Sequence, residues 1–159
     1  MVINLSKGIV GEDSANLLGA ILVTTLGLAA FSRADIPEIE RKPFAVLVDE
    51  FQSFTTLSVA NMISELRKFG VSLVLAHQHL RQLEPEVRDT VIGNAGTVIA
   101  LRMGADDAAL FAREFAPVFA PEDFVGLPNH NAYIRLLVHG NPVRPFSAHL
   151  INFGDVFPQ

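Results

Sequence analysis

The sequence contains no cysteine and no tryptophan, and it has a single tyrosine among 159 residues. Without cysteine the chain has no disulfide framework, no thiolate zinc site and no catalytic thiol. Charged residues make up only 18% of the chain, and acidic side chains outnumber basic ones to give a net charge of −5. Because phosphate contacts need clustered lysine and arginine, this balance disfavours a protein that coats nucleic acid by bulk charge.

What the chain has instead is apolar residues, which form half of the sequence. A chain of this length and composition can bury a sizeable core, so disorder and fibrous repeats are excluded. No linker, internal repeat or low-complexity tract divides it. We therefore expect one domain over residues 1–159, and the absence of cysteine fits a cytoplasmic location.

Residues 14–32 form a run without any charge. As a helix the run is just under about 30 Å long, close to the thickness of a bilayer core. Glu12 and Asp13 precede it and no basic leader is present, so it does not read as a signal peptide. Polar residues inside the run weaken it as a membrane span. We expect a helix packed in a domain core, and a small membrane protein stays as an alternative.

Further along, short apolar runs alternate with segments of helical spacing. Unbroken apolar runs of this kind are typical of parallel strands buried on both faces. The spacing predicts strands over 2–5, 44–48, 71–76 and 96–101, and helices over 57–69, 85–92 and 106–115. Two last β-like runs, 132–139 and 143–150, predict a C-terminal β-hairpin. The fold class is therefore α/β, with right-handed crossovers and a mainly parallel sheet.

Polar side chains follow three of the predicted strands at the point where each strand ends. Asp49 and Glu50 follow the first, Gln78 the second and Arg102 the third. The carboxyl ends of parallel strands share one edge of a sheet, so we expect these side chains to converge. Residues 44–50 have the form of a Walker B strand, in which Asp49 holds Mg²⁺ through water and Glu50 polarises an attacking water.

Other interpretations of these residues stay open. Two acids can simply end a strand and begin a solvated loop. Arg67 closes the helix over 57–69, where a cation complements the helix dipole, or it acts as an arginine finger for a neighbouring subunit. His77 and His79 flank Gln78, but no third ligand accompanies them, so we expect no zinc site.

An ordered set of segments resembles the C-terminal half of type IV secretion coupling proteins, the TraD/TraG-type ATPases of conjugation. These belong to the FtsK/HerA branch of RecA-like motors. The resemblance runs from about Val2 to Ser147, and it is carried by the stretches LVDEFQSF, SELRKFGVSLVLAHQHLRQL, VIGNAGTVIALRMGADDAALFAREFAP and LPNHNAYIRLLVHGNPVRPFS.

The resemblance implies a hexameric, membrane-anchored ring that drives single-stranded DNA and its attached relaxase through a secretion channel, using ATP and Mg²⁺. It assigns the Walker B pair to Asp49 and Glu50 and the sensor glutamine to Gln78. It makes Arg67 the arginine supplied to a neighbouring subunit, and it places Arg102 beside the phosphates.

The sequence departs from that family at one point, because it contains no GxxxxGK[ST] motif. A P-loop cradles phosphate with backbone N–H groups and a lysine, and nothing in the sequence replaces it. We therefore expect a partial RecA-like core that binds no nucleotide tightly alone. By analogy, the P-loop strand and membrane anchor would lie upstream of Met1.

Two kinds of partner follow from this expectation: self-association, or a half that carries the P-loop. The alternative function is a stand-alone module that folds and oligomerises without hydrolysing nucleotide.

Overall fold

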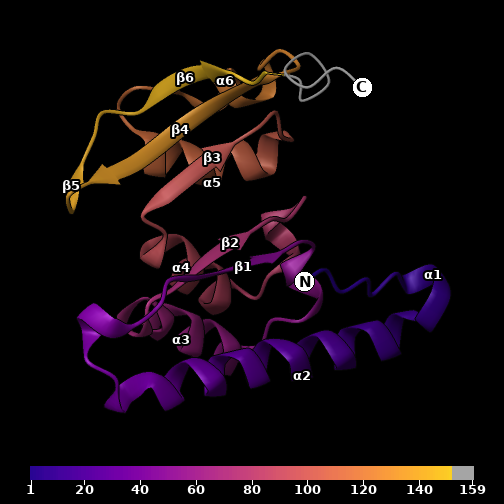
Figure 1. Cartoon of the computed structure of the whole chain (residues 1–159). Coiled ribbons are helices and arrows are strands. Elements are labelled where there is room, and N and C mark those ends of the chain that lie inside the picture. Colours follow the sequence, from indigo (N-terminus) through magenta and orange to yellow (C-terminus); the bar gives the residue numbers. More distant parts are fainter. Residues whose placement is uncertain (152–159) are drawn as a thin grey trace. The chain divides into compact units, whose positions relative to one another are not determined.

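The computed structural model describes residues 1–151, which divide between residues 94 and 95 into two compact units (Figure 1). The elements of the first unit are α1 (Lys7–Val10), α2 (Glu12–Phe31), η1 (Ser32–Asp35), η2 (Glu38–Glu40), β1 (Phe44–Val48), η3 (Phe51–Ser53), α3 (Leu57–Glu65), η4 (Leu66–Phe69), β2 (Val71–Leu75), η5 (Leu80–Gln82) and α4 (Pro85–Asn94). The strand predicted over residues 2–5 is wrong, since these residues are irregular and join neither of the described sheets.

The centre of the first unit is a parallel pair of strands. β1 and β2 align so that Phe44 faces Val71 and Val48 faces Leu75. Thr56 begins the intervening helix α3 by accepting a hydrogen bond from the backbone N–H of Val59. Gly70 ends η4 with a φ of 74°, a left-handed conformation that favours glycine. The predicted strand, helix and glycine stop are therefore confirmed.

The two strands are covered on one face only, so the prediction that they are buried on both faces is wrong. Val71 is buried and Leu73 half-buried on the covered face, whereas Leu47 is 74% exposed and Val74 54% exposed on the other. The apolar run 44–48 therefore supplies one packed face and one open apolar face.

Helix α2 packs against the rest of the first unit through small residues. Gly19 lies against the ring of Phe54, and Gly27 lies against the side chain of Met62. Ala30 joins Leu66 and Val71 in the buried cluster beneath the C-terminal end of the helix. With η1, the helix is long and apolar enough to cross a membrane, and about a fifth of its apolar window is buried in the protein.

Two arginines join the C-terminal end of α2 to the edge of the sheet where β1 and β2 begin. Arg33 donates from Nη1 to the carbonyl of Phe69 over 2.9 Å and from Nη2 to the carbonyl of Lys42 over 2.6 Å. Arg41 donates to the carbonyl of Lys68, and its guanidinium lies 5.7 Å from the ring centre of Phe69. These guanidinium groups satisfy free carbonyls at the end of η4, which fixes the start of β2.

The second unit is built on antiparallel strands. Its elements are β3 (Thr97–Ala100), α5 (Ala105–Phe115), α6 (Pro121–Val125), β4 (Asn131–Val138), β5 (Asn141–Pro142) and β6 (Phe146–His149). β4 is the middle strand, since β3 and β6 both pair with it and β5 pairs with its end. The α/β class and the C-terminal hairpin are confirmed, with the parallel arrangement confined to β1 and β2 among the described residues.

An aromatic cluster forms the core of the second unit. Phe115 and Phe124 are fully buried, with ring centres 5.3 Å apart in an edge-to-face arrangement. Tyr133 of β4 stacks on Phe119 at 3.8 Å. Burial raises the pKa of Tyr133 above its usual value of 10, and the negative charge of Asp123 raises it further. The cluster therefore ties α5 and α6 to the sheet.

The close approach of α2 to the rest of the first unit predicts the effect of substituting the glycines of this helix. A Cβ added at Gly19 would lie 2.2 Å from the Phe54 ring. We expect Gly19→Ala to lower the free energy of unfolding by about 1–3 kcal/mol, because the ring must shift out of a packed position. Chemical denaturation followed by circular dichroism measures this change.

Gly93 is the matched control, since it is also helical and a Cβ there meets nothing within 4 Å. Gly93→Ala should stabilise the protein by about 0.5–1 kcal/mol through helix propensity alone. Equal effects at the two positions would contradict the described packing of α2.

The environment of the single tyrosine predicts its titration. With a folded pKa above the unfolded value of 10, Tyr133 contributes stability that is present below pH 10 and is lost as the pH rises through the folded pKa. Absorbance of the phenolate reports this residue alone, because the sequence has one tyrosine and no tryptophan. We expect a midpoint above 10 that Asp123→Asn lowers and the neighbouring Glu122→Gln leaves in place.

Candidate active site

The carboxyl ends of β1 and β2 are held side by side beyond the last paired residues. The backbone N–H of Ala76 donates to the carbonyl of Val48 over 2.9 Å, and that of Phe51 donates to the carbonyl of Ala76 over 3.2 Å. This extension of the ladder brings the segment after β1, which carries Asp49 and Glu50, beside the segment that carries Gln78.

The Glu50 carboxylate is held by two amide side chains. Gln78 Nε2 donates to Glu50 Oε1 over 2.5 Å, and Gln52 Nε2 donates to Glu50 Oε2 over 2.5 Å. Both oxygens of the carboxylate therefore have a fixed donor from a neutral group. An amide pair orients a carboxylate without adding positive charge, and each carboxylate oxygen keeps a second lone pair that can accept a hydrogen bond from a bound water.

Glu50 also has an unusual backbone. Its φ of 51° and ψ of 40° lie in the left-handed region, which a non-glycine residue adopts at some energetic cost. Asp49 supports this turn, because its Oδ1 accepts a hydrogen bond from the Glu50 N–H over 2.9 Å. The turn directs the two consecutive carboxylates differently: Asp49 is exposed, whereas Glu50 is half-buried against the amides.

Sequence reasoning missed Gln52. The side chain is half-buried in η3, and its Oε1 is buried without a hydrogen-bond donor among the described residues. The position of Gln52 two residues after Glu50 was the one signal in the sequence. The left-handed turn at Glu50 then brings the two side chains together. The adjacent Phe51 is buried and its ring packs against His77 with the centres 5.3 Å apart.

The other two predicted residues are placed differently. Arg67 is exposed in η4, just before β2 begins, so it lies at the opposite end of the strand pair from Glu50. Arg102 is exposed just after β3 in the second unit. The structure thus brings together Asp49, Glu50 and Gln78, and it does not bring Arg67 to them within one copy.

The carboxylates at the edge where β1 and β2 end can be tested for how they would hold a divalent cation. Among residues 1–151 no group of three or more histidine, cysteine or acidic side chains gathers to hold a metal ion. An exposed carboxylate such as Asp49, acting through water, suits Mg²⁺ when phosphate oxygens supply the remaining ligands. The exposed Asp49 carboxylate therefore fits Mg²⁺ held through water together with phosphate oxygens.

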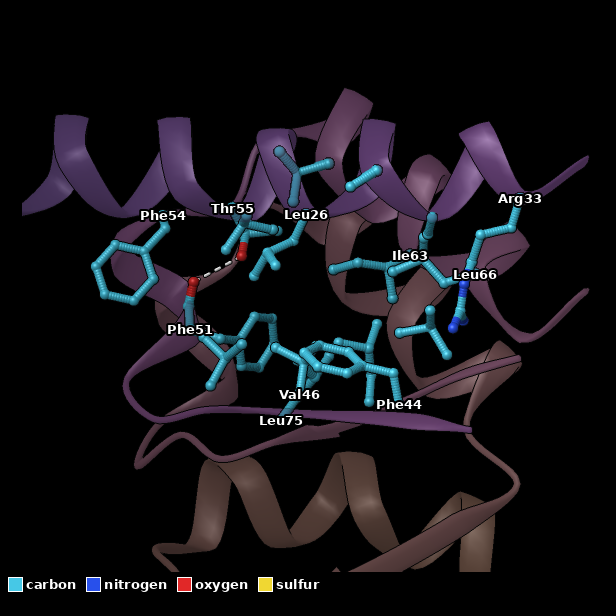
Figure 2. Close-up of a pocket in the computed structure, with 17 residues that line it drawn as sticks. Leu26, Arg33, Phe44, Val46, Phe51, Phe54, Thr55, Ile63, Leu66 and Leu75 are labelled. Atoms are coloured by element: carbon cyan, nitrogen blue, oxygen red, sulfur yellow. Dashed lines mark hydrogen bonds between the residues drawn. The ribbon is translucent and has the colours of Figure 1, made fainter. Parts of the chain in front are cut away.

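A separate pocket of about 220 Å³ lies on the covered face of the strands (Figure 2). Leu26 of α2 faces Val46 and Leu75 across it, and Arg33 stands at one end. Its lining is apolar and includes none of the predicted site residues. The pocket belongs to the packing of α2 over the sheet. Besides that guanidinium its lining includes the hydroxyl of Thr55, which already donates to the carbonyl of Phe51.

The chain matches one family model, described as the TraM recognition site of TraD and TraG, over residues 43–119. That segment begins at β1 and ends after α5, so it includes Asp49, Glu50, Arg67, Gln78 and Arg102. No curated protein sequence matches the chain.

Several solved structures share the fold. The plasmid coupling protein TrwB, in complex with a non-hydrolysable ATP analogue, matches with a TM-score of 0.64 and 17% identity over 84% of this chain and 37% of that one. VirB4 of Thermoanaerobacter pseudethanolicus matches with a TM-score of 0.53 and 17% identity, over 79% of this chain and 35% of that one. The genome packaging NTPase B204 of Sulfolobus turreted icosahedral virus 2 matches with a TM-score of 0.58 and 14% identity, over 95% of this chain and 73% of that one.

This chain spans little more than a third of the matched TrwB and VirB4 chains, and these similarities show the fold. The match to TraD and TraG over residues 43–119, together with the fold shared with TrwB, agrees with the resemblance to conjugation coupling ATPases predicted from the sequence.

Proposed function

We propose that the chain is the C-terminal portion of an ATP-driven, DNA-translocating motor of the conjugative coupling type. The observation that carries the proposal is the paired hydrogen bonding of Glu50 by Gln78 and Gln52 beside the exposed Asp49. A carboxylate oriented by neutral amides can position an attacking water, and the exposed carboxylate beside it can meet the water shell of a metal ion, so the pair suits nucleotide hydrolysis.

In this proposal each residue has one role. Asp49 holds Mg²⁺ through water, and Glu50 polarises the water that attacks the γ-phosphate. Gln78 senses the phosphate and Gln52 positions Glu50, while Arg102 lies beside the phosphates. Mg²⁺ supplies charge neutralisation on the phosphate oxygens when it is bound with ATP.

Arg67 acts in a neighbouring subunit. Its exposed position at the far end of the strand pair supports this role, because a guanidinium there reaches a phosphate only across an interface. The proposal therefore includes self-association of the motor.

Hydrolysis also needs a P-loop, which the 159 residues do not contain. A P-loop-bearing part of the protein or of a partner supplies the phosphate cradle, and the chain alone binds no nucleotide tightly. The transported partners are single-stranded DNA and a relaxase, at the cytoplasmic face of a membrane to which an upstream anchor attaches the motor. The TraD and TraG family description adds a TraM-type protein as a recognition partner.

The proposal predicts how activity depends on Glu50. The full chain is mixed with the P-loop-bearing half of a TrwB-like coupling protein, and phosphate release from Mg-ATP is measured. We expect hydrolysis only in the mixture, and Glu50→Gln should lower its rate by at least about a hundredfold, since the general base is lost.

Gln82→Ala is the control, because Gln82 is an exposed glutamine in η5, a short distance along the chain from Gln78. It should leave the rate unchanged, whereas Gln78→Ala should lower it. A Glu50→Gln mixture as active as the original would overturn the assigned roles. Tight binding of Mg-ATP to the chain alone, measured by calorimetry, would show that a phosphate cradle other than a P-loop exists here. A mixture that binds but never hydrolyses would favour the alternative, a folding and oligomerisation module.

A further inference from the structure

The outer face of α2 differs from the surface of an ordinary soluble helix. The helical residues between Ser14 and Leu28 that are exposed recur at intervals of three and four, so they form one continuous face. None of them carries a charge; they are Ser14, Leu17, Leu18, Ile21, Thr24, Thr25 and Leu28. Because the inner face carries no charge either, this stretch of the helix is uncharged all round and leucine and isoleucine dominate its outer face, which favours a covered surface.

The hydroxyl groups on and next to this face include two that are already satisfied within the helix. Thr25 donates from its Oγ1 to the carbonyl of Ile21 over 2.7 Å, and Ser32 donates to the carbonyl of Ala29 over 2.8 Å. Covering Thr25 therefore costs little in lost hydrogen bonds to water, because its hydroxyl already donates within the helix. The methyl group of Thr25 remains available for packing.

Four side chains on this face are spaced as in a helix-pairing seam. Leu17, Ile21, Thr24 and Leu28 follow one another at steps of four, three and four residues, which is the a/d spacing of a coiled coil. Leu17 is 63% exposed and Leu28 is 61% exposed. The spacing reads the same in both directions about a point between residues 22 and 23.

We propose that the outer face of α2 pairs with the same face of a second copy, antiparallel and about a two-fold axis next to Leu22 and Val23. In this arrangement Leu17 of one copy meets Leu28 of the other, and Ile21 meets Thr24. A two-fold interface requires a surface that is complementary to itself, and the palindromic spacing supplies it.

The charges at the two ends of the helix favour this occupant. Glu12 and Asp13 lie in the first turn, while Arg33 and Asp35 follow the last turn and Arg33 is already bonded to carbonyls of its own chain. Antiparallel pairing keeps the two acidic starts apart, whereas parallel pairing would bring them together, and it aligns the two helix dipoles favourably. A bilayer surface fits less well, since an interfacial helix carries lysine or arginine beside its apolar face and this face has none. The pairing is independent of nucleotide hydrolysis.

Cysteine cross-linking tests the proposal on a clean background, because the chain has no cysteine. Leu17→Cys protein is mixed with Leu28→Cys protein under mild oxidation, with each variant alone as a control. We expect a disulfide-linked dimer in the mixture and not with either variant alone, since two copies of position 17 would lie about 16 Å apart along the helix axis. Ile39→Cys, at an exposed apolar residue outside the face, is the control for random collision.

Sedimentation velocity of the unmodified full chain gives the second readout. We expect reversible dimerisation in roughly the micromolar range, as fits a single pair of helices. Leu17→Lys should weaken dimerisation at least about tenfold, because it buries an unpaired cation in the seam. Adding Leu28→Glu in the same chain should restore dimerisation, because each introduced ammonium then meets an introduced carboxylate of the other copy. Circular dichroism verifies that each variant is folded.

Three results would overturn the proposal: a monomer at every concentration, cross-linking of Leu17→Cys with itself, or a dimer that ignores both substitutions. Binding of the chain to lipid vesicles that is abolished by Leu17→Lys, without any dimer in solution, would assign the face to a membrane instead.

Discussion

The parallel pairing of β1 with β2 is the constraint on which the first unit depends. Its register carries past the strand ends, through the hydrogen bonds of Ala76 and Phe51, and so fixes where the two following segments lie. Glu50 and Gln78 are 28 residues apart in the chain, and they meet only because the strands run in the same direction with matched ends. An antiparallel pair would place them at opposite edges.

Helix α2 approaches helix α3 and the segment before it closely, and small residues at the contact make this possible. Gly19 and Gly27 provide them against Phe54 and Met62, while the apolar pocket marks where the cover is incomplete. With only a partial cover inside, α2 also presents an uncharged outer face that is rich in leucine and isoleucine. The proposed pairing covers that face.

The sequence was most informative where local chemistry decides the structure. Gly70 stops a helix because its φ is positive, and the apolar runs at 44–48 and 71–75 become strands in a matched register. The meeting of Glu50 and Gln78 followed from strand direction alone. These features depend on residues near in sequence or on one topological rule.

Features set by tertiary contacts were beyond the sequence. The exposure of Leu47 and Val74 depends on how many layers cover the strands, which an apolar run does not state. The left-handed turn at Glu50, and with it the bond from Gln52, occurs at a residue type that rarely adopts this conformation. The antiparallel partner of β3 came from the hairpin strand β4 rather than from a crossover.

The position of Arg67 constrains how copies of the chain can assemble. A five-residue strand separates it from the edge that holds Glu50, a distance of roughly 16 Å. The proposed role of Arg67 therefore requires head-to-tail contact, in which different surfaces of two copies meet and the contact repeats around a ring. The α2 face is self-complementary and closes on itself as a pair. The two proposed contacts thus have different symmetries, since the Arg67 contact repeats from copy to copy whereas the α2 contact closes as a pair.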